Sequence, residues 1–287
     1  MLVGVLASAG CAPDPAPTPT KDPISLAITD VEADRIQRFD LSFEGATLSE
    51  VAWEPLTGPA GIAPSDDGEW LFVTSFVTHE LLRLEAGGGD DAEVLFRDTA
   101  VIEEPVALIE DGDSFLLLGN DTGNVARIGA DGEVLSTFGE GFLRQPHDFA
   151  LGPDGLLYVA NAAWRHDVGL IQVFDPETGE RVRDFALPEV LLDAVGLAFD
   201  RDGTLLVADW FGARVLRFDA GTGELLETVL DADDGVDAPL DVTVTASGEL
   251  LFLDRADVVL FDGDGLYTLV DGAEAGLDWP RGLELLR

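Results

Sequence analysis

The chain has 287 residues, with 16 Lys and Arg against 56 Asp and Glu, and its formal net charge is −40. Hydrophobic residues make up 46% of it, so a chain of this length can bury a sizeable core. The charge argues against nucleic-acid binding, because that affinity comes largely from Lys and Arg on phosphates. The single cysteine, Cys11, excludes a disulfide framework and a cysteine-based zinc cluster.

Residues 1–11 predict a signal-like segment. A short apolar run, residues 2–7, leads through small residues to Cys11, as in the tail of a secretory signal. The segment resembles a bacterial lipobox, and that resemblance implies a cysteine that is acylated and becomes the mature N-terminus. The alternative is a plain leader with a chance cysteine.

Residues 12–23 predict a proline-rich tether, since Pro13, Pro15, Pro17, Pro19 and Pro23 alternate along them and proline-rich segments are extended and semi-rigid. Together with the lipobox, the tether predicts an extracytoplasmic lipoprotein, at the outer membrane or cell surface. Membrane contact is then expected only through the lipid anchor.

From residue 24 onward one unit is repeated. Its opening element, a Pro or Ala followed three residues later by an apolar residue, often with Gly or Asp before that residue, occurs six times. The copies are residues 59–62, 105–108, 146–149, 194–197, 239–242 and 280–283. Their mean spacing is about 44 residues, which is typical of a four-stranded propeller blade. The five intervals between these copies are five units, and residues 24–58 and 280–287 together amount to a sixth unit of this length.

The repeat predicts an all-β fold, a six-bladed β-propeller over residues 24–287 whose N- and C-terminal segments share one blade. We expect strand 283–285 to complete the sheet that starts near residue 26. A ring closed in this way leaves no long free edge.

Short apolar runs separated by turn residues fill each unit, and helical periodicity is absent from it. The second strands end at Asp30, Ser75, Asn120, Asn161, Asp209 and Asp254. The Asp-Gly pairs at 67–68, 111–112, 131–132, 154–155, 202–203 and 264–265 predict tight turns with positive φ.

The strongest copy, residues 145–161 followed by 169–175, carries the resemblance to a known family. The body resembles an NHL-repeat six-bladed β-propeller, and residues 58–68 also resemble the related YVTN-type repeat. The resemblance implies an architecture, whereas function depends on the site.

In such a blade, the loop before the first strand and the loop between the second and third strands lie on one face of the disc. We expect this face to bind, because its loops carry aromatic and charged residues. The candidate residues are His147, Asp148, Asn161, Trp164, Arg165, His166, Asp209, Trp210, Asp241, Asp254, Arg255 and Arg281. Several of these residues also have a structural interpretation in place of a role in binding. The repeated Asp or Asn can serve as a turn residue, His147 can pack or make a local hydrogen bond, and Trp210 can wedge between blades.

We expect a non-catalytic monomer, without cofactor, metal or catalytic residues, that binds a protein, peptide or glycan partner. The alternative is a metal-dependent hydrolase, lactonase or lyase of the six-bladed class that uses His147, Asp148 and Asp241. Enzymes of that class hold their metal with acidic, amide or histidine side chains from several blades. The openings here are mostly apolar, and two of the three histidines, His147 and His166, belong to one unit. Zinc needs three or four convergent ligands.

Overall fold

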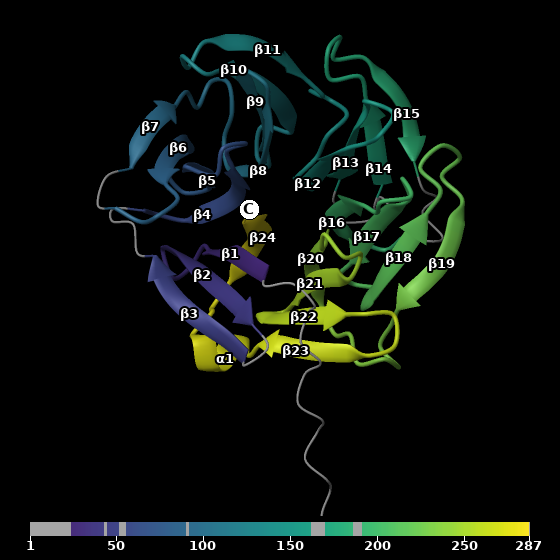
Figure 1. Cartoon of the computed structure of the whole chain (residues 1–287). Coiled ribbons are helices and arrows are strands. Elements are labelled where there is room, and N and C mark those ends of the chain that lie inside the picture. Colours follow the sequence, from purple (N-terminus) through teal and green to yellow (C-terminus); the bar gives the residue numbers. More distant parts are fainter. Residues whose placement is uncertain are drawn as a thin grey trace, which may run out of the picture.

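The computed structural model describes residues 24–42, 45–51, 56–89, 92–161, 170–185 and 191–286. These residues form six four-stranded antiparallel sheets arranged in a ring (Figure 1). The fold is a six-bladed β-propeller, which confirms the predicted class. Within the described residues, no helix is long and apolar enough to cross a membrane.

From the innermost strand outward, blade I contains β24 (Pro280–Leu286), β1 (Ile24–Asp30), β2 (Arg35–Ser42) and β3 (Gly45–Val51), and blade II contains β4 (Pro59–Pro64), β5 (Trp70–Ser75), β6 (Glu80–Glu85) and β7 (Glu93–Phe96). In the same direction, blade III contains β8 (Pro105–Asp111), β9 (Ser114–Gly119), β10 (Asn124–Gly129) and β11 (Val134–Phe138), and blade IV contains β12 (Pro146–Leu151), β13 (Leu157–Asn161), β14 (Leu170–Phe174) and β15 (Arg181–Phe185). Blade V contains β16 (Ala194–Phe199), β17 (Leu205–Asp209), β18 (Arg214–Phe218) and β19 (Leu225–Leu230), and blade VI contains β20 (Pro239–Val244), β21 (Leu250–Asp254), β22 (Asp257–Phe261) and β23 (Leu266–Val270). A short helix, α1 (Gly272–Ala275), lies between β23 and β24.

Blade I joins the two ends of the propeller. Strand β24 pairs antiparallel with β1, with Ser25 opposite Leu286 and Asp30 opposite Pro280. The last strand of the sequence is therefore the innermost strand of the blade that holds the first three strands. This pairing confirms the predicted shared blade, and it closes the ring so that each blade has two neighbours.

The apolar core lies between the blades. The buried side chains fall into six clusters, each contributed by two neighbouring blades. On β17, Leu205 packs in the cluster with Tyr158 of blade IV, and the adjacent Leu206 packs in the cluster with Phe252 of blade VI. Because side chains of a strand alternate between its faces, a middle strand buried on both sides reads as an unbroken apolar run. This explains the continuous runs in the sequence.

The hairpins divide between two faces. We call the face with the loops before the innermost strands and between the second and third strands the opening face, and the other the turn face. On the turn face, Gly155 has φ +77° and the Asp154 carboxylate accepts a hydrogen bond from Leu156 N at 3.1 Å. The prediction for 264–265 is wrong in detail. In that hairpin the positive φ, +95°, belongs to Gly263. The Asp262 carboxylate accepts hydrogen bonds from Asp264 N and Gly265 N, so the turn lies two residues earlier than predicted.

Candidate functional site

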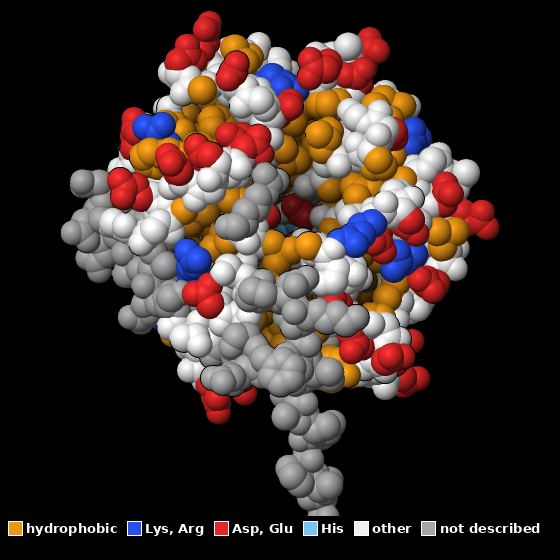
Figure 2. Space-filling model, in the orientation of Figure 1, with side chains coloured by type: hydrophobic (Ala, Val, Ile, Leu, Met, Phe, Trp, Pro, Cys, Tyr) orange, Lys and Arg blue, Asp and Glu red, His pale blue; other side chains and the backbone are white. Residues whose placement is uncertain are grey.

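A channel runs along the axis of the propeller, lined by the innermost strand of every blade, and it encloses about 320 Å³. Figure 2 shows its opening as a hollow at the centre of the disc, with acidic side chains inside it and hydrophobic side chains around it. A site at this place receives side chains from all six blades, whose innermost strands are held in register by the closed ring.

The channel wall begins with a ring of six residues, one from each innermost strand, which we call the mouth ring. Its members are Ala60, Val106, His147, Val195, Leu240 and Arg281. Each innermost strand carries one extra residue at this level relative to its partner strand. Such β-bulges redirect a side chain out of the regular alternation. The bulges therefore place these side chains along the channel, a feature that the sequence did not reveal.

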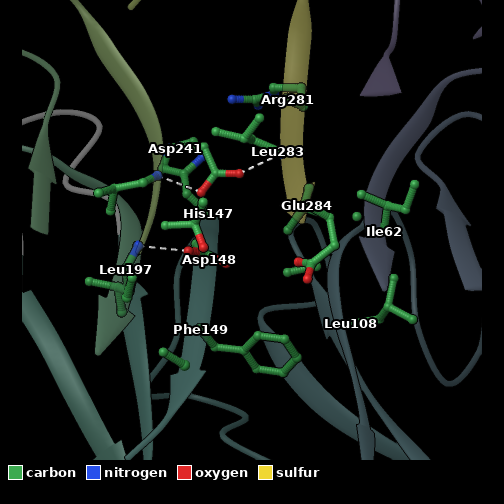
Figure 3. A pocket seen from close by; sticks show the side chains of 18 of the residues that line it. Ile62, Leu108, His147, Asp148, Phe149, Leu197, Asp241, Arg281, Leu283 and Glu284 are labelled. Atoms are coloured by element: carbon green, nitrogen blue, oxygen red, sulfur yellow. Dashed lines mark hydrogen bonds between the residues drawn. The ribbon is translucent and has the colours of Figure 1, made fainter. Parts of the chain in front are cut away.

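The next level of the wall holds two aspartates, and both join neighbouring blades. The Asp148 carboxylate on β12 accepts a hydrogen bond from Leu197 N of blade V at 2.7 Å. The Asp241 carboxylate on β20 accepts from Leu283 N of blade I, also at 2.7 Å, and from its neighbour Val242 N (Figure 3). Each carboxylate thus satisfies a backbone donor of the following innermost strand.

Burial makes these two carboxyls poor acids. Burial, followed by the negative charges of Asp241 and Glu284, raises the pKa of Asp148 well above its usual range. Burial also raises the pKa of Asp241, against the hydrogen bonds from Leu283 N and Val242 N that lower it. Two carboxylates that face each other at low dielectric cannot both ionise at little cost. The pair therefore retains a proton to higher pH than free aspartates do.

His147 and Arg281 occupy the mouth ring and are both partly buried. Among the described residues, neither ring nitrogen of His147 has a hydrogen-bond partner. Burial, and less strongly the charge of Arg281, lowers the pKa of His147 to about 4, so its imidazole is neutral at pH 7. Burial lowers the pKa of Arg281, whose guanidinium carbon lies 4.9 Å from the centre of the Trp279 ring.

The predicted candidates separate into groups. His147, Asp148, Asp241 and Arg281 line the channel together. Glu284 lines it too, and sequence reasoning missed it. The signal for Glu284 was a lone acid three residues after Arg281 on the last strand, which the repeat aligns with small or apolar residues in most other blades. Whether these residues bind a partner stays a prediction.

Asn161, Asp209 and Asp254 lie at the ends of second strands and bond to backbone. Each accepts a hydrogen bond from the segment before the innermost strand of its own blade: Asn161 from Arg144 N, Asp209 from Asp193 N and Asp254 from Ala238 N. Asp209 also pairs with Arg214 at 2.8 Å. These contacts give the three side chains a structural task, and a part in binding is untested.

Trp210 and Arg255 lie in loops of the opening face. Trp210 is partly buried against the cluster between blades V and VI, and its ring stacks on that of Phe211 at 5.1 Å. Arg255 is exposed and pairs with Asp237. The remaining predicted residues, Cys11, Trp164, Arg165 and His166, lie outside the described residues.

The opening face also carries exposed apolar side chains that the sequence analysis did not single out. They lie in loops of four blades: Val77, Phe142, Leu192, Phe211 and Trp279. Phe211 is 62% exposed. On the turn face, Leu151 is the corresponding case among the described large hydrophobic residues. The other exposed members of that class lie on outermost strands.

In the described part of the chain, no group of three or more His, Cys, Asp or Glu is arranged to hold a metal ion. Both oxygens of Asp241 and one oxygen of Asp148 already accept backbone hydrogen bonds. This donor set fits backbone bonding between blades better than it fits a metal ion.

Comparison with family models and with curated proteins finds no match. Solved structures with the same fold are found. A chain in a nidogen/laminin complex has a TM-score of 0.73 at 18% identity, over 92% of this chain and 98% of that one. Virginiamycin B lyase from Staphylococcus aureus has a TM-score of 0.65 at 19% identity, over 90% and 84%. A protein of unknown function from Bacteroides caccae has a TM-score of 0.69 at 14% identity, over 93% and 100%.

These similarities define the class of the protein, a six-bladed β-propeller. One related structure comes from a protein complex and another from an enzyme, so the fold is compatible with binding and with catalysis. Membership of the NHL-repeat family, which the repeat pattern suggests, stays a prediction.

Proposed function

We propose that this protein is a binding propeller whose opening face docks a protein or peptide partner. The observation that carries the proposal is the set of exposed apolar side chains in the loops of that face: Val77, Phe142, Leu192, Phe211 and Trp279. Exposed apolar side chains that gather on one surface mark interaction sites, and large aromatic residues dominate interface energetics.

The two faces of the disc differ in a way that supports this choice. The turn face consists of hairpins whose Asp side chains bond to their own backbone, as Asp154, Asp175 and Asp219 do. The turn face is therefore strongly acidic, and the carboxylates of these hairpins already accept hydrogen bonds. The opening face combines apolar side chains with the channel mouth, so a partner can bury apolar area there and insert a side chain into the channel.

The proposed location rests on the residues at the start of the chain. We propose that Cys11 carries a lipid and that residues 12–23 tether the propeller outside the cytoplasm. Incorporation of labelled palmitate in a bacterial host, and its loss in Cys11→Ser, is the expected result. A wild-type protein that stays unlabelled contradicts the lipid anchor and leaves the docking proposal to its own test.

The docking proposal is tested by pairing a face variant with a matched variant elsewhere. Phe211→Ser with Trp279→Ala removes two exposed aromatic groups from the opening face. Leu226→Ser with Val134→Ser removes apolar groups from outermost strands. We expect purified wild type and the outer variant to retain the same envelope protein, and the face variant to lose affinity by about 30-fold, the effect of a loss of about 2 kcal/mol.

If binding is lost only in the outer variant, the docking site does not lie on the opening face. A glycan is the other partner class consistent with the sequence. A glycan array probed with wild type and the face variant distinguishes it, since a glycan-binding propeller would give a signal in the absence of any envelope protein.

A hydrolase or lyase is the second candidate, and the observation in its favour is the pair of buried carboxyls, Asp148 and Asp241, whose pKa values are raised. Perturbed acids in a cavity are frequent at catalytic sites. Elemental analysis of the purified protein and a panel of small lactones and esters test it. Stoichiometric metal with chelator-sensitive turnover would replace the binding proposal.

A further inference from the structure

The channel mouth contains a partly buried cation that lacks a counter-charge among the described residues. Arg281 is partly buried, and within the described residues no carboxylate lies within ion-pair distance of its guanidinium. Its contact is the face of Trp279, at 4.9 Å. A charge that is partly withdrawn from water is usually paired, since desolvation without compensation is costly. The guanidinium therefore has unused donors that point to an anionic ligand.

The acids of the channel do not supply that charge. The carboxylates of Asp148 and Asp241 are directed to Leu197 N and Leu283 N. Glu284 projects from the same strand as Arg281 but lies deeper in the channel, at about the level of Asp148 (Figure 3). Asp148 is affected electrostatically by Asp241 and Glu284, whereas the electrostatic partner of Arg281 is His147. The channel is thus divided into a donor-rich mouth and an acidic interior.

His147 adds a second unused polar group to the mouth. It lies on β12 of blade IV, which is opposite blade I in a ring of six and therefore faces Arg281 across the channel. Both of its ring nitrogens are buried and unpartnered among the described residues. A neutral imidazole offers one N–H donor and one acceptor, so a ligand between the two strands can receive hydrogen bonds from both sides.

The remaining members of the mouth ring, Ala60, Val106, Val195 and Leu240, are apolar. We propose that the channel mouth binds a single carboxylate on an apolar body, held by the guanidinium fork of Arg281 and by an N–H of His147. Arginine suits a carboxylate because its planar fork donates two parallel hydrogen bonds. The acidic interior repels a second carboxylate, and the cavity of about 320 Å³ limits the size of the body.

This site does not require the opening face to dock a protein, because the carboxylate can belong to a small free acid or to the C-terminus of a peptide. The probes are 3-phenylpropionate and its neutral amide, and acetyl-Gly-Gly-Phe with a free or an amidated C-terminus. Binding is followed by the imidazole signals of histidine-labelled full-length protein. The chain has three histidines, and His147→Gln identifies the signal of His147.

We expect at least one free carboxylate to shift the His147 signal saturably and its amide not to. Binding of 3-phenylpropionate assigns the site to small acids, and binding of the peptide alone assigns it to a partner's C-terminus. Arg281→Gln should weaken binding at least about tenfold, and Arg281→Lys less, because it keeps the charge but loses the fork. Arg97→Gln, which removes an exposed arginine paired with Glu80, is the matched control.

Equal binding of acid and amide to the wild type, or no binding of either pair, overturns the proposal. The wild-type comparison keeps it falsifiable even if Arg281→Gln fails to fold. Binding unchanged in a folded Arg281→Gln also overturns it.

Discussion

The wall of the channel is made of two kinds of innermost strand. Strands β12, β20 and β24 carry its charged and titratable side chains, which are His147, Asp148, Asp241, Arg281 and Glu284. Strands β4, β8 and β16 contribute Gly, Ala, Val, Leu and Ile. All six occupy the same place in the repeated unit, so the difference arises from side chains rather than from backbone position.

Both kinds of strand solve one packing problem, the close approach of neighbouring innermost strands. At Gly196 an added Cβ would lie 2.8 Å from the Cα of Asp241, and at Gly61 it would lie 2.7 Å from the Cα of Ala107. Asp148 and Asp241 instead reach the next strand with a carboxylate. The glycine arrangement costs little, whereas two buried carboxyls repel each other. Because the protein keeps the more costly carboxylate arrangement in part of the channel wall, we expect these carboxyls to have a function.

The largest expected effect comes from deleting residues 280–287. This removes β24, which carries Arg281 and Glu284 and also contributes Leu283 to the core between blades VI and I. We expect no cooperative melting transition, or a Tm lower by about 10 °C or more, corresponding to a loss above about 4 kcal/mol. Deleting residues 1–23 is the control and should leave the Tm within about 2 °C. Similar Tm values for the two deletions would contradict the role of the shared blade.

Gly196→Ala tests the apolar half of the wall. The added methyl group meets the backbone of β20 at 2.8 Å, so blades V and VI must separate, and we expect a loss of about 2 kcal/mol in the free energy of unfolding. Gly87→Ala, where nothing lies within 4 Å of the added Cβ, should change it by less than about 0.5 kcal/mol. Urea unfolding of both variants measures the difference, and equal losses would show that the approach is not tight.

Asp148→Asn tests the charged half. A carboxyl whose pKa is higher in the folded than in the unfolded chain stabilises the fold fully below its unfolded value of about 4, and this contribution is lost as pH rises toward the folded value. Asparagine can still accept from Leu197 N and cannot ionise. We therefore expect the Tm of Asp148→Asn to exceed that of wild type at pH 8 by about 2–4 °C, the effect of roughly 1 kcal/mol in a protein of this size.

The control for this variant is Asp175→Asn. Asp175 lies on the turn face, and hydrogen bonds from Thr178 N and Glu177 N lower its pKa, so its removal should not stabilise the protein at pH 8. Melting curves of the two variants and wild type from pH 4 to 8 provide the test. Parallel curves for Asp148→Asn and wild type would show that Asp148 is not protonated more readily in the fold.

The smallest effect is expected from Glu284→Gln. Its charge is the last of the contributions that raise the pKa of Asp148, so the wild-type loss of stability with rising pH should become smaller by less than about 0.5 kcal/mol. The same change in an Asp148→Asn background should have no such effect, because the interacting partner is gone. An equal effect in both backgrounds would show that Glu284 does not act through Asp148.

Much of the architecture could be predicted from particular residues. The opening elements at 59, 105, 146, 194, 239 and 280 determine the number of blades, and the part-units at the two ends imply the pairing of β24 with β1. The repeat also aligns His147 with Arg281, and Asp148 with Asp241. The exposed Phe142, Leu192, Phe211 and Trp279 could not be predicted, since an apolar residue in a loop reads the same whether it is buried or exposed.

The sequence by itself determined the local features: strands, turns and the period of the repeat, which depend on residues close together in the chain. Only the tertiary structure decided which side chains meet. Arg281 and His147 are separated by three units of the repeat, and they face one channel because closure of the ring places blade I opposite blade IV. Among the described residues, neither has a carboxylate partner, because Asp148 and Asp241 direct their carboxylates to backbone N–H groups. That direction depends on the bulges and on the spacing of neighbouring strands, which are properties of the assembled wall.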